Sequence, residues 1–188
     1  MARAFYDDPP FMWMLPDAAT RLRRTRRLFA VLVRGEALAY GGVDVARMDG
    51  QVAGAAIWLP PGHWKPTTAE QLRMLPGFAL ACGARIGAVS ELAQAMLRAH
   101  PHEPHWYLNA IGVDPARQGT GVASALLRSR LEQCDHDRQP AYLEATKATS
   151  VPLYQHFGFE STGSPELPVG APPLTAMWRS SAAGPPAA

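Results

Sequence analysis

The sequence predicts a single domain of mixed structure, in the α/β or α+β class, and three observations support this prediction. The chain has 188 residues, of which 47% are hydrophobic and 18% charged, as in a folded domain with a sizeable core. Strand-forming runs alternate with helical patterns along most of its length. A loop with two glycines stands between a β-branched run and an Ala/Leu-rich helix, within Ile111–Ala123.

The N-terminal third predicts a loop, a helix and a hairpin. Residues 5–10, FYDDPP, are expected to form a loop with no strand before it. Asp17 is a candidate N-cap for a helix that runs to about residue 34. Asp49-Gly50 lies between the strand-like runs 43–48 and 51–59, and this dipeptide is the strongest short signal for a β-hairpin.

Residues 66–99 predict one or two helices with a break at Pro76-Gly77. The part from Phe78 to Leu97 is apolar enough to suggest a membrane span. Charged and polar residues, among them Arg85 and Glu91, interrupt it, so we favour an amphipathic helix packed on the protein.

The C-terminal half predicts alternating strands and helices, followed by a short tail. Residues 180–188 are small and Pro-rich and are expected to be disordered, which leaves residues 1–179 as the domain. The expected elements are a strand at 106–113, a helix at 119–134, a strand at 141–146, a short helix at 151–157 and extended segments at 160–164 and 174–179.

Net charge and residue spacing do not predict a site for nucleic acid, for an anionic membrane or for a metal ion. A net charge of +2 is too small to predict binding to nucleic acid or to an anionic membrane. The arginines of residues 21–27 are expected to form a solvated helix face, with binding of RNA or an acidic partner as the alternative. His100, His102 and His105 match no standard metal-ligand spacing, so no metal is expected.

Cysteine and arginine usage bear on the source and compartment of the protein. The two cysteines provide no disulfide or metal framework, and no signal peptide is recognised at Met1, so we expect a reducing cytoplasm. Of the 18 basic residues 16 are Arg, and the chain is rich in Ala, which indicates a GC-rich bacterial genome.

The glycine loop predicts a site for an anionic group, because backbone N–H groups at a helix N-terminus bind phosphates. The phosphate-binding signature G-x-x-x-x-G-K-[ST] is absent. The dinucleotide signature G-x-G-x-x-G begins at Gly119 and Gly121, but Ser124 replaces its third Gly. Because an acidic residue, Glu144, lies downstream, a dinucleotide-binding fold remains one alternative interpretation. An ordinary strand-to-helix turn is the other.

Two motifs resemble those of the GCN5-related N-acetyltransferase (GNAT) family. Residues 118–123, QGTGVA, match its Q/R-x-x-G-x-G/A signature, and residues 152–159, PLYQHFGF, resemble its later Tyr motif, which ends in Gly-Phe. The likeness extends to the puromycin N-acetyltransferase-like branch. It rests there on AFYDDP at 4–9, WMLPD at 13–17, PHWYL at 104–108, YLEAT at 142–146 and MWR at 177–179.

The resemblance implies a mostly antiparallel central sheet, with helices on both faces and a V-shaped splay between strands 106–113 and 141–146. Family members carry a strand ahead of the AFYDDP segment, so we expect this first strand to be missing here, with 66–99 as a helical insert. The implied co-substrate is acetyl-CoA. Its expected contacts are Ile111 and Val113 through their backbone, together with Gln118, Gly119, Thr120, Gly121, Val122, Ala123, Ser124 and Ser150, the last at a position where the family often has Asn.

The resemblance also assigns roles in catalysis. Tyr154 is expected to act as the general acid, and Glu144 is our candidate for the base that deprotonates the acceptor ammonium group. A tyrosine in the core and a solvated strand carboxylate are the simpler alternatives. Tyr6, Trp13 and Trp58 are expected to line the acceptor pocket, although core packing would explain them equally well.

The sequence therefore predicts an N-acetyltransferase that moves the acetyl group of acetyl-CoA to a primary amine of a small molecule. The alternative is a non-catalytic acyl-CoA-binding regulatory module of the same fold. Monomer and homodimer both remain open.

Overall fold

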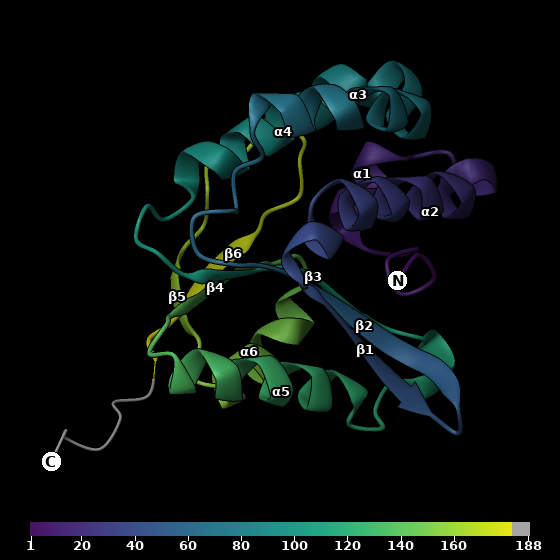
Figure 1. Ribbon diagram of the computed structural model, residues 1–188. Helices are drawn as coiled ribbons and strands as arrows, with labels where there is room; N and C mark the ends of the chain where they lie inside the picture. Colours follow the sequence, from purple (N-terminus) through teal and green to yellow (C-terminus); the bar gives the residue numbers. More distant parts are fainter. Residues whose placement is uncertain (182–188) are drawn as a thin grey trace, which may run out of the picture.

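The computed structural model describes residues 1–181 and shows a six-stranded sheet between two layers of helices (Figure 1). From residue 182 on, the predicted tail lies outside the described residues. The strand order is β1-β2-β3-β4-β6-β5, and β3 and β4 form the one parallel pair of this sheet. This confirms the predicted fold class. The strands are β1 Val43–Met48, β2 Gln51–Leu59, β3 Trp106–Val113, β4 Ala141–Ala145, β5 Glu160–Gly163 and β6 Thr175–Arg179.

The helices cover both faces of the sheet. The first four lie on one face, called here the upper face, and the last two lie on the lower face (Figure 1). Pro9 and Pro10 belong to a short helix where the sequence predicted only a loop, because Pro suits the first helical turn, which needs no N–H donor. The helices are α1 Pro9–Met14, α2 Ala18–Gly35, α3 Thr68–Cys82, α4 Ile86–Ala99, α5 Val122–His136 and α6 Val151–His156.

The predicted hairpin is confirmed at the expected residues. Asp49 and Gly50 connect β1 to β2, and both have positive φ angles, 53° and 73°. Two successive residues with positive φ form the turn whose twist matches the twist of a β-hairpin.

The helical segment after β2 differs from its prediction in two respects. The break lies at Gly83, with φ +56°, and not at Pro76, which is inside α3. Its outer face also carries exposed leucines, Leu72, Leu75 and Leu80. Thr68–Ala99 is long and apolar enough to cross a membrane by length and composition, and 17% of its most apolar window is buried, so it is packed on the protein less closely than expected.

The sheet opens between β3 and β4. These strands pair only from Trp106 to Leu108 and from Ala141 to Leu143. In the pairing of β2 with β3, Ile57 is opposite Ala110 and the next residue, Trp58, is opposite Leu108. Asn109 is therefore the extra residue of a β-bulge. A bulge bends the strand that contains it. From this point β3 follows β2 and diverges from β4, as the predicted splay requires.

Candidate active site

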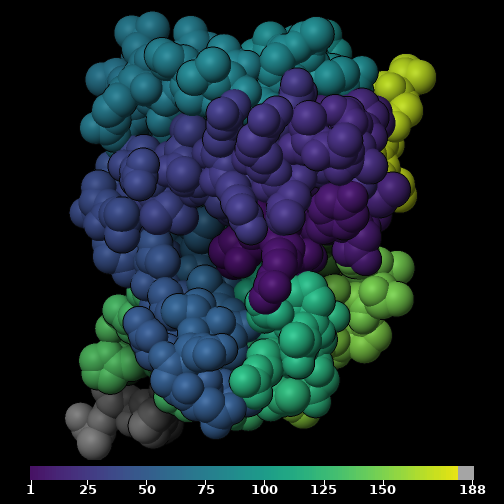
Figure 2. All heavy atoms as spheres, turned by 90° about the vertical axis from the view of Figure 1, so that its right-hand side faces the viewer, coloured from purple at the N-terminus to yellow at the C-terminus, as the bar shows by residue number. Residues whose placement is uncertain are grey.

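A cavity of about 230 Å³ lies where β3 and β4 diverge. It is smaller than most ligand pockets, so it suits a short chain and not a whole nucleotide. The N-terminal segment covers part of it, and Figure 2 shows this segment against residues around 110–120. The lining residues are Ala4, Phe5, Asp8, Leu108, Asn109, Ala110, Ile111, Gly112, Val113, Gln118, Ala123, Leu143, Glu144, Thr146, Lys147, Ser150, Leu153 and Tyr154.

A second, larger depression of about 390 Å³ lies between α2 and α3. Apolar side chains and three arginines, Arg27, Arg34 and Arg73, line it. It contains none of the predicted site residues, so we place the candidate active site in the smaller cavity.

The structure gathers most of the predicted site residues around this smaller cavity. Both candidate catalytic residues, Tyr154 and Glu144, are among its lining residues. Five predicted co-substrate contacts also line it, namely Ile111, Val113, Gln118, Ala123 and Ser150. The remaining contacts lie beside it, with Gly119, Thr120 and Gly121 in the turn before α5 and Val122 and Ser124 in the first turn of α5. Of these, Val122 is 6% exposed and packs in the core, so its side chain cannot contact a ligand there.

The turn before α5 has the geometry of an anion site. Gly119 and Gly121 have φ angles of +76° and +84°, which side chains rarely adopt, and the space around both is open. The hydroxyl of Thr120 donates a hydrogen bond of 2.6 Å to the carbonyl oxygen of Arg117, and so stabilises the turn. The first N–H groups of α5 have no acceptor within the helix and carry the positive end of its dipole. These features fit a pyrophosphate group.

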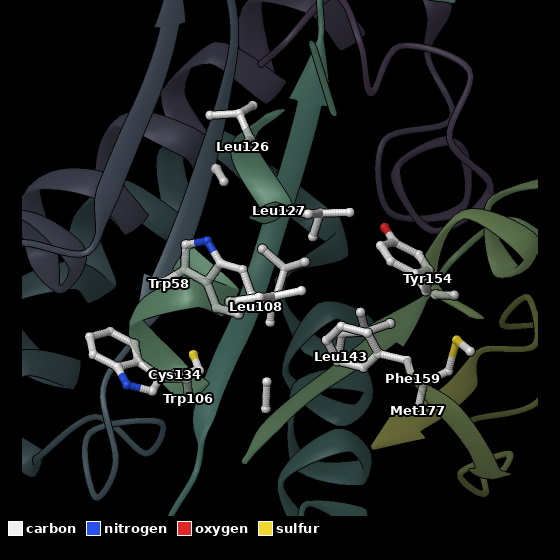
Figure 3. Close-up of a cluster of buried hydrophobic side chains, with 14 of the residues drawn as sticks. Trp58, Trp106, Leu108, Leu126, Leu127, Cys134, Leu143, Tyr154, Phe159 and Met177 are labelled. Carbon is white, nitrogen blue, oxygen red and sulfur yellow. The ribbon is translucent and has the colours of Figure 1, made fainter. Parts of the chain in front are cut away.

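Tyr154 lies on α6 at the boundary between the cavity and the lower core, which is the buried cluster between the lower face of the sheet and helices α5 and α6. Its ring contacts Phe159 edge-on, at 6.1 Å between centroids. Figure 3 shows its hydroxyl directed away from Phe159 and Met177. Burial, with a smaller contribution from the charge of Asp8, raises the pKa of Tyr154 to about 12. The phenol therefore keeps its proton at neutral pH, as a general acid must.

Asp8 is a site residue that the sequence reasoning missed. It is 3% exposed, and its Oδ2 accepts a hydrogen bond of 2.5 Å from the hydroxyl of Thr146. Its Oδ1 makes no close hydrogen bond among the described residues, although the backbone N–H of Phe11 stabilises the charged form of this carboxyl. Burial raises the pKa of this carboxyl. Its place in the Asp-Asp-Pro run was the available signal, but the pattern gave no reason to separate Asp8 from its exposed neighbour Asp7.

Glu144 points to the other face of the sheet from Tyr154. Along β4, Leu143 packs in the lower core, whereas Tyr142 packs in the upper one, and the same alternation directs Glu144 upward. Its side chain is 2% exposed, so it is not a solvated edge carboxylate. Its Oε1 has no hydrogen-bond partner among the described residues and lies 3.7 Å from Nδ1 of His100. The two candidate proton-transfer groups thus approach one opening from opposite faces.

Buried tyrosines surround this carboxylate. Burial, followed by the charge of Glu144 and a hydrogen bond to its carboxylate, raises the pKa of Tyr107 and of Tyr142 above the ordinary value. Both phenols therefore remain protonated beside Glu144 at neutral pH.

The aromatic residues expected to bind the acceptor lie elsewhere. Trp58 is 0% exposed and packs in the lower core, so the structure gives it a core role and not a contact with an acceptor. Trp13 lies under the guanidinium of Arg85, at 4.8 Å, and Tyr6 is exposed at 39%. Neither is among the residues that line the cavity.

The basic helix face is only partly solvated. Arg23, Arg26 and Arg27 are exposed as expected. Arg21 is instead 7% exposed and donates hydrogen bonds to the carbonyl oxygens of Leu15, Pro16 and Tyr6. It therefore anchors the N-terminal segment that covers the cavity.

The fold and this site define an acetyltransferase of the GNAT class. Residues 3–159 match the model of the acetyltransferase (GNAT) family, so the chain belongs to this family. Members use acetyl-CoA as co-substrate and transfer its acetyl group to small-molecule or protein amines.

Individual relatives agree with this family. A crystal structure described as histone acetyltransferase HPA2 and related acetyltransferase, from Corynebacterium glutamicum, has a TM-score of 0.74 and 29% identity, over 99% of this chain and 89% of that one. An uncharacterized N-acetyltransferase from Schizosaccharomyces pombe is 25% identical over 83% of this chain and 66% of its own length. A mycothiol acetyltransferase from Acidothermus cellulolyticus is 37% identical over 36% of this chain and 22% of its own length. The chain thus spans less than two thirds of the length of these curated relatives.

Proposed function

We propose that the protein is an acetyl-CoA-dependent N-acetyltransferase that acts on a primary amine of a small molecule. The observation that carries the proposal is that Tyr154 and Glu144 line one cavity where β3 and β4 diverge. A small acceptor agrees with the size of this cavity and with the N-terminal segment that covers part of it. We also propose, from the sequence segments that resemble it, that the chain is related to the puromycin N-acetyltransferase-like branch.

Acetyl-CoA fits the residues present. The open turn at Gly119 and Gly121 offers backbone N–H groups for its pyrophosphate. On the side of β4, the peptide groups of β3 beyond Leu108 have no strand partner among residues 1–181 and can bind an extended arm. The carboxyl groups of Asp8 and Glu144 give this cavity a polar lining. When bound, acetyl-CoA supplies an acetyl group activated as a thioester.

The chain's own residues would supply the proton transfers. Glu144 removes a proton from the acceptor's ammonium group, because the free amine is the nucleophile. Tyr154 donates its proton to the departing sulfur, and the second proton that the nitrogen loses as the amide forms restores the phenol. Burial keeps water away from both groups and strengthens their interactions with developing charge.

Acetyl-CoA binding alone does not separate this proposal from the non-catalytic module, because both would bind it. The family match and the placement of two proton-transfer groups in one cavity favour the enzyme. The regulatory module would bind acetyl-CoA and release no CoA in the presence of any amine.

Thiol release measures the activity directly. Purified protein is incubated with acetyl-CoA and a panel of small primary amines, such as agmatine, spermidine and benzylamine, and with peptides as protein-like acceptors. We expect release with at least one small amine, and Tyr154→Phe should lower kcat by about 100-fold or more. Acetyl-CoA affinity by calorimetry should change little.

Tyr40→Phe is the matched control, because Tyr40 hydrogen-bonds Glu70 outside the cavity. It should keep the wild-type rate. An unchanged rate in Tyr154→Phe would remove Tyr154 from its role, and release with peptides alone would contradict the small-molecule acceptor.

A further inference from the structure

A buried cluster on the upper face extends inward from Glu144. His100, at the end of α4, is 4% exposed, and His105, just before β3, is 0% exposed. Their Nε2 atoms lie 3.0 Å apart. Nδ1 of His105 lies 2.6 Å from the carbonyl oxygen of Glu103, and Nδ1 of His100 lies 3.7 Å from Oε1 of Glu144. The two histidines are thus linked to each other and to a backbone carbonyl group at hydrogen-bond distances, and His100 lies within ion-pair distance of the candidate base.

The acceptor at the far end of this chain determines the tautomers. A carbonyl oxygen only accepts, so Nδ1 of His105 carries its proton and donates it to Glu103. In neutral His105, Nε2 is then an acceptor, and the proton between the two rings belongs to Nε2 of His100. Neutral His100 therefore presents an unprotonated Nδ1 to the carboxylate of Glu144.

This arrangement leaves one vacant proton position. A nitrogen lone pair and a carboxylate oxygen, both acceptors, lie 3.7 Å apart in a buried setting, and the phenols of Tyr107 and Tyr142 donate to the same carboxylate. One additional proton between them would relieve their repulsion, either on Glu144 or on His100.

We propose that His100 receives the proton that Glu144 removes from the acceptor's ammonium group, and that His105 holds His100 in the tautomer able to receive it. This inference rests on the proposed function. The ammonium N–H bond breaks, and the amine nitrogen keeps the electron pair. The proton passes to the carboxylate of Glu144 and from there to Nδ1 of His100, where a new N–H bond forms. The pair ends as carboxylate and imidazolium, and later releases the proton to solvent.

The surroundings of His100 support a cation on this ring. The indole of Trp64 stacks on it at 4.0 Å between centroids, and Tyr107 and Tyr142 contact it edge-on at 4.7 and 4.8 Å. A stacked indole stabilises an imidazolium by a cation–π interaction. The ionisable groups that face His100 are these two phenols, Glu144 and His105.

The second histidine is suited to remain neutral. Burial lowers the pKa of His105, although its hydrogen bond to the carbonyl group of Glu103 opposes this. His105 also contacts Trp178 edge-on at 5.3 Å, so its ring is held between the strands and cannot turn freely. It acts through His100 and is a positioning residue.

NMR of the ring nitrogens tests the pair without any acceptor. In ¹⁵N-labelled protein at about pH 8, we expect the Nε2–H tautomer for His100 and the Nδ1–H tautomer for His105. On acidification Nδ1 of His100 should take up the proton. In Glu144→Gln this uptake should change, because the neighbouring carboxylate is gone. A neutral His100 protonated at Nδ1, or a titration unaffected by Glu144→Gln, would overturn the inference.

Kinetics test the role of the pair. His100→Gln retains a donor toward His105 but cannot take up a proton, and it should lower kcat by about 10-fold or more with little change in KM. It should also change the acidic limb of the kcat/KM profile, because Glu144 then takes the proton alone. His105→Asn should lower kcat without abolishing activity.

His102→Gln is the matched control, because His102 is an exposed residue of the same loop. It should match the wild type at every pH. A uniform loss of rate in His100→Gln, with an unchanged pH profile, would assign His100 a structural role and contradict the inference. If the wild type acetylates no amine while the NMR result holds, the proposed function fails and the histidine pair stands. If the enzyme is active but the tautomers differ, only this inference fails.

Discussion

Glu36 provides a quantitative test of the electrostatics of the upper core. This residue follows α2 and is 8% exposed. Burial, with a smaller contribution from Glu70, raises its pKa from 4.5 to about 7. Each pKa unit corresponds to about 1.4 kcal/mol, so ionised Glu36 destabilises the folded state by up to about 3 kcal/mol. Replacing it by the neutral isostere, Glu36→Gln, removes this effect.

The sign of the pH dependence follows from the raised pKa. Between pH 4.5 and about 7 the folded state binds more protons at this site than the unfolded state, so stability falls as pH rises. Above this window both states are ionised and the destabilisation is complete. Below it both are protonated and the destabilisation is absent. Glu36→Gln should therefore match the wild type at low pH and exceed its stability at high pH.

Urea unfolding at a series of pH values measures this difference. We expect the free energy of unfolding of Glu36→Gln to exceed the wild-type value by about 3 kcal/mol near pH 8 and by about zero near pH 4.5. Glu132→Gln, an exposed change on α5, is the control and should give no pH-dependent difference. A difference between Glu36→Gln and wild type that stays constant with pH would refute the reasoning.

Three further substitutions test the turn, the core and a partly buried ion pair. Gly121→Ala should weaken acetyl-CoA binding about 3- to 10-fold in calorimetry, because a side chain strains the backbone at φ +84° in the turn that binds the ligand. Gly62→Ala introduces similar strain at φ +80° outside this turn and should bind acetyl-CoA normally. Leu127→Ala removes a side chain that is 0% exposed and should lower the free energy of unfolding by about 2–5 kcal/mol in urea. Arg130→Met should lower the free energy of unfolding by about 1–3 kcal/mol, because the carboxylate of Asp44 loses the guanidinium group 2.6 Å away. Adding Asp44→Asn to this variant should recover part of the lost stability.

Local patterns predicted those parts of the fold that local chemistry determines. The hairpin at Asp49-Gly50 occurs at the expected residues because two positive φ angles are needed there and few residues adopt them. The glycine turn before α5 was likewise predictable from its sequence. The break in 66–99 was misplaced, because Pro76 is accommodated within α3 and the chain turns at Gly83 instead.

Side-chain placement depended on contacts that are distant in the sequence. Glu144 could be assigned to a strand, but whether that strand was central or at an edge depended on its pairing with β3 and β6. Trp58 was expected in a pocket, and only the alternation along β2 shows that it faces the lower core. His100 and Glu144 are 44 residues apart, and no pattern in either segment indicated their contact.

The position of bound CoA tests the central claim most directly. A crystal structure of the protein with CoA should show the pyrophosphate at the N–H groups of the turn at Gly119–Gly121. The sulfur should lie within hydrogen-bonding distance of the hydroxyl of Tyr154, on the side of the cavity that Glu144 shares. CoA bound in the groove between α2 and α3, or a sulfur remote from Tyr154, would contradict the account.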